Sequence, residues 1–259
     1  MEKEKNERFE TAEEQGPMTV VGRNPVLELF KSGREIEKLY IQRGEREGSI
    51  TKIFALAKDR MIPVSEVDKK RLDSIAGGNA HQGVAAVTSS LVYVSVADMV
   101  RTAQEKGQKP LIVVCDGIED PHNIGAILRS AEGAGAHGVV LSKRHCSVIG
   151  QTVFKASAGA AAYVPIAKVS NIASAVDELK RLGVWLYAAS VDGICYTDVD
   201  FDGACAIVLG NEGDGISRLV REKCDFTVSI PMYGRVSSLN VSAAAAILLF
   251  DAAGKQRKS

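Results

Sequence analysis

The sequence predicts an α/β protein with a mainly parallel sheet, preceded by a smaller α/β module. From residue 111 onward, short apolar runs typical of buried strands alternate with longer runs typical of helices. Polar, glycine-containing loops follow three of these strands. Loops at the carboxyl ends of parallel strands meet at one edge of the sheet, where ligands bind in such folds. A shorter series of strand and helix patterns occupies the first part of the chain.

Composition is typical of a water-soluble globular protein and excludes several classes of function. The 259 residues are 46% hydrophobic and 25% charged, with a formal net charge of zero, so any nucleic-acid contact must rest on local patches. No apolar run reaches the roughly 20 residues of a membrane span, and no signal-peptide core begins the chain. The cysteines lack CxxC spacing, which favours reduced thiols in a cytoplasmic protein and indicates neither a metal site nor a disulfide framework. They are Cys115, Cys146, Cys195, Cys205 and Cys224.

The first part of the chain divides into a tail, a module and a linker. Residues 1–17 are acidic and nearly free of apolar side chains, which predicts a disordered tail. Residues 18–95 read as a small α/β domain, and the polar stretch within 96–109 reads as a linker to a second domain at 110–259. Within the module, the patterns predict helices at 25–30, 49–60 and 68–76 and strands at 36–41, 63–67 and 83–89.

In the second domain the periodicity of apolar residues places strands and helices in alternation. The strand-like runs are 111–115, 139–141, 184–188, 205–209 and 226–230. The helix-like runs are 123–133, 151–161, 170–182 and 215–223, and a long segment from 243 to 253, apolar on nearly every side, predicts a buried final helix.

A glycine motif at residues 133–138 matches GxGxxG but does not indicate a dinucleotide site. Its glycines follow a helix pattern and lead into a strand, whereas the phosphate-binding fingerprint requires strand, loop and then helix. Gly133 and Gly135 are better explained as helix-end and turn residues.

Three loops remain as candidates for a site: 116–125, 210–215 and 232–240. Arg129 follows the first loop on a helix whose neighbouring residues are small or apolar, and such arginines often hold phosphate or carboxylate. In the second loop Glu212 lies among glycines that allow main-chain amides to approach a ligand. Taken alone, each loop also has a simpler interpretation. The first loop could supply only a helix cap and a surface arginine, and Glu212 in the second could be only a solvated turn carboxylate.

The three loops resemble, in order, the three motifs of SpoU (TrmH) RNA methyltransferases of the SPOUT superfamily. The matching segments are NIGAILRSA from Asn123, LGNEGDGI from Leu209 and IPMYGRVSSLNVS from Ile230. More loosely, residues 22–27 and 81–84 resemble the opening and closing segments of the ribosomal-protein-like RNA-binding domain found in the rRNA-modifying subgroup. This second likeness favours 23S rRNA, and a guanosine within it, as the substrate.

The resemblance implies a trefoil-knotted catalytic domain, a homodimer and S-adenosylmethionine as the cofactor. It implies that Arg129 is catalytic, that Asn123, Ser238 and Asn240 hold this arginine and the ribose, and that Ser237 is an additional participant. Glu212 would orient the arginine or act as the base. The implied cofactor-binding residues are Gly210, Ile230, Leu239, Ala189, Leu209 and Met232.

Chemistry adds constraints to this interpretation. Arginine is effectively always protonated, so Arg129 is expected to position a phosphate and to stabilise the developing alkoxide instead of removing a proton. His122 is a conventional candidate for a base, although a loop histidine beside a proline is more often structural. Tyr233 and Arg235 could add a base stack and a phosphate contact. The alternatives are a tRNA ribose methyltransferase and a non-catalytic RNA-binding module.

Overall fold

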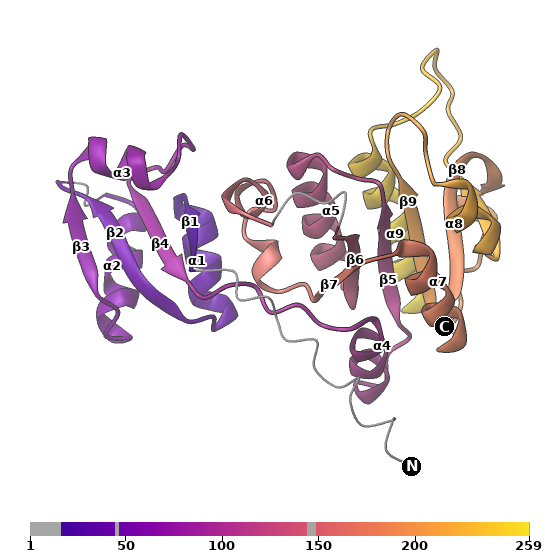
Figure 1. Cartoon of the computed structure of the whole chain (residues 1–259), viewed down its shortest axis with the longest axis horizontal. Helices are drawn as coiled ribbons and strands as arrows, with labels where there is room; N and C mark the ends of the chain where they lie inside the picture. Colours follow the sequence, from indigo (N-terminus) through magenta and orange to yellow (C-terminus); the bar gives the residue numbers. More distant parts are fainter. Residues whose placement is uncertain (1–16, 45–46, 144–148, 259) are drawn as a thin grey trace.

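The computed structural model describes residues 17–44, 47–143 and 149–258, which form two sheets with their own helices (Figure 1). All but the last residue of the predicted tail, and Cys146, lie outside the described residues. The small domain is drawn in indigo to magenta and the large one in magenta to yellow (Figure 1).

The small domain is a four-stranded sheet in the order β1-β4-β2-β3, accompanied by three helices. Strands β1 and β2 are antiparallel to β4, while β2 and β3 are parallel. Strand β1 was not expected, because its four residues are too few to give a clear alternation. The elements are β1 (Met18–Val21), α1 (Arg23–Ser32), β2 (Ile36–Gln42), α2 (Ser49–Asp59), β3 (Val64–Val67), α3 (Lys69–Ile75) and β4 (Val84–Thr88).

The large domain is a six-stranded sheet in the order β10-β8-β9-β5-β6-β7, in which every neighbouring pair is parallel. The predicted α/β class with a mainly parallel sheet is therefore confirmed. Three of its strands, β5, β6 and β9, are almost continuously buried, as parallel strands covered on both faces are. The strands are β5 (Leu111–Asp116), β6 (Gly138–Ser142), β7 (Ile166–Val169), β8 (Trp185–Cys195), β9 (Cys205–Gly210) and β10 (Phe226–Ser229).

Helices cover both faces of this sheet. Leu111 and Val113 of β5 belong to the core shared with α5 and α9, whereas Ile112 and Val114 belong to the core shared with α4 and α7. Alternate residues of one strand therefore serve opposite layers. The helices are α4 (Val96–Glu105), α5 (Pro121–Ala134), α6 (Gln151–Ala156), α7 (Ile172–Arg181), α8 (Arg218–Lys223) and α9 (Val241–Gln256), with short 3-10 turns η1 (Ala160–Ala162) and η2 (Tyr196–Asp198).

Helix α4 lies within the stretch that the sequence predicts to be a linker. Its buried residues Val96, Met99, Val100 and Ala103 follow helical spacing and pack on the large sheet. Ser95 caps the helix in a capping box with Asp98. The polar residues that follow the helix obscured this pattern in the sequence. Of the predicted linker, only the residues after Glu105 connect two elements, α4 and the next strand.

Strand β8 leaves the sheet for several residues before it returns. Thr227 of β10 pairs with Ala188 and the next residue, Val228, pairs with Ile194, so residues 189–193 loop out of the ladder. Gly193 closes this excursion against β10, where an added Cβ would lie 2.6 Å from the backbone of Thr227. The excursion carries its side chains toward the carboxyl edge of the sheet.

The two domains pack directly through α6 and the segment that follows it. Tyr163 donates a hydrogen bond of 2.7 Å to the Glu28 carboxylate, and Asn79 donates one of 3.1 Å to Gln151. Burial and the neighbouring Glu28 carboxylate raise the pKa of Tyr163 to about 12. The hydrophobic core of the small domain is continuous with one face of the large sheet. In the described stretches, no helix combines the length and apolar character needed to cross a membrane.

Candidate functional site

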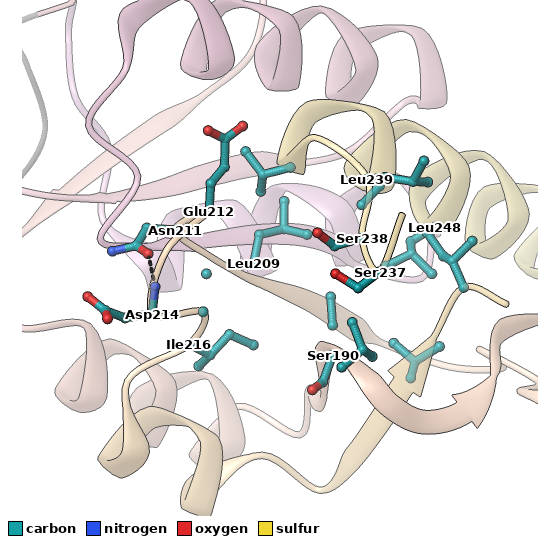
Figure 2. A pocket seen from close by; sticks show the side chains of 18 of the residues that line it. Ser190, Leu209, Asn211, Glu212, Asp214, Ile216, Ser237, Ser238, Leu239 and Leu248 are labelled. Atoms are coloured by element: carbon teal, nitrogen blue, oxygen red, sulfur yellow. Dashed lines mark hydrogen bonds between the residues drawn. The ribbon is translucent and has the colours of Figure 1, made fainter. Parts of the chain in front are cut away.

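A cavity of about 500 Å³ lies at the carboxyl edge of the large sheet, between β8, β9, β10 and the start of α9 (Figure 2). Its volume lies within the range of cofactor sites, and its position is where open parallel sheets bind ligands. The second and third predicted loops, 210–215 and 232–240, contribute most of its polar lining.

Every residue that the sequence comparison implied for cofactor binding lines this cavity. Ser237 and Ser238 line it as well, on the loop before α9, with Leu209 on β9 nearby (Figure 2). The apolar side chains offer a surface for a flat ring, and the exposed backbone groups offer hydrogen bonds. The six implied residues are Ala189, Leu209, Gly210, Ile230, Met232 and Leu239.

The loop after β9 is held in a tight shape by its own residues. Asn211 and Gly215 exchange backbone hydrogen bonds of 3.1 Å, and the side-chain oxygen of Asn211 accepts from the amides of Gly213 and Asp214 at 2.9 and 2.6 Å. Gly210 lies against the returning chain so closely that a Cβ there would be 2.0 Å from the carbonyl carbon of Gly215. Only glycine fits this position without moving the loop.

Three side chains from the three predicted loops meet beside this cavity. The Nδ2 of Asn240 donates to Glu212 Oε1 at 2.5 Å and to Asn123 Oδ1 at 2.9 Å, and the Nδ2 of Asn123 donates to Glu212 Oε1 at 3.3 Å. We call these three residues the amide–carboxylate junction. Glu212 Oε2 accepts no hydrogen bond from any described residue, so one carboxylate oxygen stays available.

Local structure fixes two members of the junction. Asn240 is the N-cap of α9, and its side-chain oxygen accepts from the amide of Ser242 at 3.0 Å. Asn123 is 8% exposed and lies in the first turn of α5, whose cap is Asp120. A cap role for Asn123 itself is therefore wrong, because Asp120 accepts from the amide of His122 in that position.

Arg129 does not join the junction within this chain. It is exposed on α5 and makes no ion pair with any described residue. It lies six positions after Asn123, which turns the two side chains about 120° apart around the helix. Among the described residues no hydrogen bond links Arg129 to Asn123, Ser238 or Asn240, so the expectation that they hold this guanidinium stays a prediction. His122 is also exposed.

Sequence reasoning missed the residues that close the other side of the cavity. Arg221 of α8 lines it and donates to both carboxylate oxygens of Asp192 at 2.8 and 2.7 Å. Ser190, on the excursion of β8, donates to the same carboxylate, and these two partners lower the pKa of Asp192. The available signal was only one of several basic residues on a short, highly charged helix. Among the described residues no group of three or more His, Cys, Asp or Glu is arranged to hold a metal ion.

Comparison with known families decides the affiliation of the chain. Residues 110–250 match the family described as SpoU rRNA Methylase, and residues 19–94 match the domain described as RNA 2'-O ribose methyltransferase substrate binding. The chain belongs to the SpoU methylase family. It is a TrmH/SpoU-type RNA methyltransferase, and the family uses S-adenosylmethionine as its methyl donor.

Relatives match the SpoU chain over nearly its whole length. A putative TrmH family tRNA/rRNA methyltransferase of Staphylococcus haemolyticus is 41% identical over 242 residues, which is 93% of this chain and 97% of the relative. The Bacillus subtilis protein YacO, with the same description, is 39% identical and covers 90% of this chain and 93% of its own.

Among solved structures, the SpoU methyltransferase AviRb of Streptomyces viridochromogenes in complex with AdoMet has a TM-score of 0.78 at 26% identity. The alignment covers 94% of this chain and 92% of AviRb. The site of the present chain fits this cofactor: apolar side chains of Leu209, Ile230 and Leu239 can enclose an adenine ring, and the Glu212 carboxylate complements a positively charged sulfur.

Proposed function

We propose that this SpoU methylase transfers a methyl group to the 2′-hydroxyl of a ribose, and that its target is a guanosine of 23S rRNA. The observation that carries this proposal is the amide–carboxylate junction, because it combines three motif loops beside the cofactor-sized cavity. Carboxylate and amide groups are suited to orienting a sugar hydroxyl and accepting its proton.

The proposed chemistry assigns a separate task to each oxygen of Glu212. When bound, S-adenosylmethionine would supply a methyl group on positively charged sulfur, and its uncharged thioether would be the leaving group. Asn123 and Asn240 hold Oε1 of Glu212 through their amides, so the carboxylate is fixed in place. Oε2 is then the acceptor for the hydroxyl proton. Ser238, on the cavity wall, is assigned to the ribose.

Arg129 is assigned to the RNA. Its guanidinium stays protonated throughout, so it binds a phosphate next to the target ribose and stabilises negative charge that develops on the ribose oxygen. Its exposure and its lack of an ion-pair partner among the described residues leave it available for this contact. Because no described residue of the junction contacts Arg129, we assign the guanidinium to RNA bound across both groups, or to the site of a second copy of the chain.

We also propose a knotted, cytoplasmic homodimer as the active form. Phe250 on α9 is 55% exposed and lies next to Gly133 of α5, so an aromatic ring stands on this outer surface where a second copy would cover it. Such a dimer would bring an arginine of one subunit near the site of the other. The knot itself stays a prediction from the family resemblance.

A tRNA ribose is the second candidate substrate, because the relatives are described as tRNA/rRNA methyltransferases. Against it, the Aquifex aeolicus TrmH/SpoU tRNA modifying enzyme covers only 63% of this chain, with a TM-score of 0.53. More than a third of this chain lies outside that match, a length comparable to that of the small domain. The small domain is the part that matches an RNA substrate-binding domain, which supports a larger structured RNA such as rRNA.

Mapping of ribose methylation in rRNA and tRNA from cells with and without the gene tests the proposal. We expect one 2′-O-methyl group to disappear from a guanosine of 23S rRNA and to return with the wild-type gene but not with Glu212→Gln. Loss of a tRNA methyl group instead would assign the second candidate. Unchanged maps in both RNAs would favour a binding module without catalysis.

A further inference from the structure

The segment between β10 and α9 is the most exposed apolar part of the described chain near the site. Residues 233–240 are all exposed, with Tyr233 at 96% and Val236 at 70%. The segment projects from the large domain as the gold loop at the top of Figure 1. No residue from 231 to 239 forms a hydrogen bond with any described residue. Within the part of the chain that the structure describes, nothing therefore compensates for exposing this tyrosine.

Both ends of this loop belong to the site. Met232 at its start and Ser237 to Leu239 at its end line the cavity, and Asn240 next along the chain joins the junction. The tip, residues 233–236, is therefore held beside the reacting groups by its two ends. Gly234, within the tip, has no atom within 4 Å of the position where a Cβ would stand, so the tip has room to adjust.

Charge distinguishes this loop from the other walls of the cavity. The neighbouring loop after β9 carries Glu212 and Asp214, which repel phosphate. The cations of α8 are already paired, Arg218 with Glu222 at 2.7 Å and Arg221 with Asp192. Arg235, by contrast, has no ion-pair partner among the described residues, and residues 230–240 contain no acidic side chain.

We propose that Tyr233 and Arg235 form a nucleotide clamp for the RNA residue that flanks the target ribose. The proposal rests on the proposed function, because a ribose methylated within a polymer necessarily brings a neighbouring nucleotide to the edge of the site. Tyr233 stacks on the flanking base, and Arg235 binds its phosphate with the guanidinium fork. Stacking accepts any base, so the clamp contributes affinity and register more than sequence recognition.

A second copy of this chain is the competing occupant of the loop. A protein interface would also cover Tyr233 and Val236. If this loop packed on the same loop of a second copy, however, Arg235 would meet no acidic side chain, because residues 230–240 contain none. The RNA backbone supplies that negative charge directly. The RNA assignment therefore accounts for both the aromatic and the cationic residue.

Steady-state methyl transfer to 23S rRNA fragments tests the clamp. Tyr233→Ala should raise KM for RNA roughly tenfold, the scale of one lost base stack, with kcat and calorimetric cofactor affinity nearly unchanged. Tyr233→Phe keeps the ring and should restore KM. Arg235→Gln should weaken RNA binding and reduce its salt dependence by about one ion contact, whereas Arg218→Gln, a matched exposed arginine, should do neither.

The outcomes separate the clamp from the proposed function. If the wild-type protein methylates RNA but Tyr233→Ala leaves KM unchanged, only the clamp is wrong. If Tyr233→Ala converts a dimer to a monomer in sedimentation, and RNA binding falls only with that change, a second copy occupies the loop and the clamp is overturned. If the wild-type protein methylates no RNA, the proposed function fails first.

Discussion

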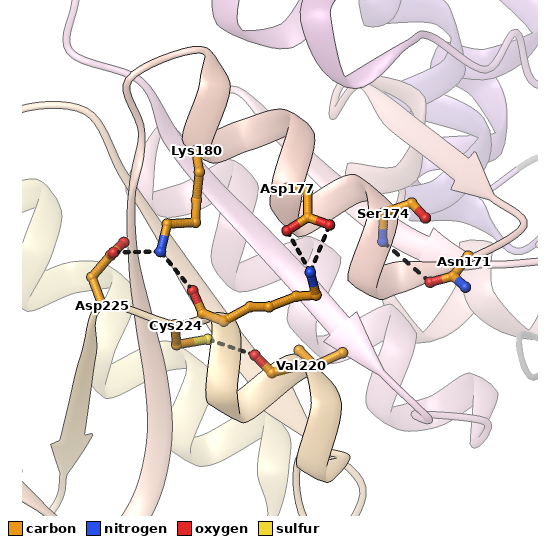
Figure 3. Close-up of polar contacts among 8 residues, drawn as sticks. Asn171, Ser174, Asp177, Lys180, Val220, Cys224 and Asp225 are labelled. Carbon is orange, nitrogen blue, oxygen red and sulfur yellow. Dashed lines mark hydrogen bonds and ion pairs between the residues drawn. The ribbon is translucent and has the colours of Figure 1, made fainter.

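Two polar clusters at different places in the large domain differ in how their charges are compensated. Around α7 and α8, Lys223 donates to both oxygens of Asp177 at 2.6 and 2.7 Å, and Lys180 pairs with Asp225 at 2.7 Å (Figure 3). Lys180 also donates to the carbonyl of Lys223, and Asp225 accepts from the amide of Leu186. We call these four charged residues, Asp177, Lys180, Lys223 and Asp225, the paired cluster.

The amide–carboxylate junction is incomplete by comparison. One oxygen of Glu212 has no partner among the described residues, and neither do the guanidinium groups of Arg129 and Arg235. A charge matched within the chain contributes to stability, whereas an unmatched charge beside a cavity is available to a ligand. The paired cluster is therefore expected to affect folding, and the junction with its nearby arginines is expected to affect activity.

The largest expected effect comes from Arg129. Arg129→Ala should lower single-turnover methyl transfer by roughly 10²–10⁴-fold, the scale of a positioned catalytic group, because the RNA phosphate and the developing charge lose their cation. Calorimetric affinity for S-adenosylmethionine should not change, since Arg129 does not line the cavity. Arg101→Ala, which removes an exposed arginine on α4, is the control and should retain activity. Near-normal turnover of Arg129→Ala would refute the role.

The next effect concerns the shape of the loop after β9. Gly210→Ala places a Cβ 2.0 Å from the Gly215 carbonyl carbon and 2.1 Å from the Ile216 nitrogen, so the loop must move. We expect cofactor affinity in calorimetry to fall at least about tenfold, or 1.4 kcal/mol. Gly213→Ala in the same loop meets its nearest atom at 3.6 Å and should cause a smaller loss. Equal losses in both variants would contradict this explanation.

A smaller effect is expected in the paired cluster. Asp177→Asn removes the negative charge opposite Lys223, and we expect the free energy of unfolding to fall by about 0.2–1 kcal/mol, as for partly exposed pairs. Methyl transfer at saturating substrate should stay at the wild-type rate. Chemical denaturation and a turnover assay on the same preparation measure both. A large loss of turnover with unchanged stability would reverse the comparison drawn above.

The smallest effect is a pH dependence at His137. The Nδ1 of this histidine accepts from the amide of Leu111 at 3.1 Å, and burial, with Lys106 nearby, lowers its pKa. The unfolded chain therefore takes up a proton more readily than the folded one, so stability should fall as pH drops through about 6.5 toward the lowered pKa. His137→Asn keeps an acceptor and should flatten this part of the stability profile; an unchanged slope would exclude His137 as its source.

The sequence allowed the architecture to be predicted where apolar runs were long. Strands such as β5 and β9, buried on both faces, stand out in any window of the sequence. Strand β7, with four residues, and helix α4, beside a polar stretch, were not recognised. The excursion of β8 was also hidden, because it depends on how Gly193 packs against β10.

The site could be predicted in its composition but not in its geometry. The motif loops identified Asn123, Glu212 and Asn240, and the structure brings them into contact. The offset of Arg129 from Asn123 follows from their spacing on the predicted helix, about 120° around its axis, but the motif match by itself does not take this offset into account. The pair formed by Asp192 and Arg221 joins an excursion to a separate helix, so no local pattern announces it.

Methyl transfer from labelled S-adenosylmethionine to purified rRNA and tRNA, followed by nucleoside analysis, tests the central claim most directly. The account predicts labelled 2′-O-methylguanosine from 23S rRNA with the wild-type protein, and roughly 10²–10⁴-fold less with Glu212→Gln. Label on a base, or equal transfer by both proteins, would contradict it.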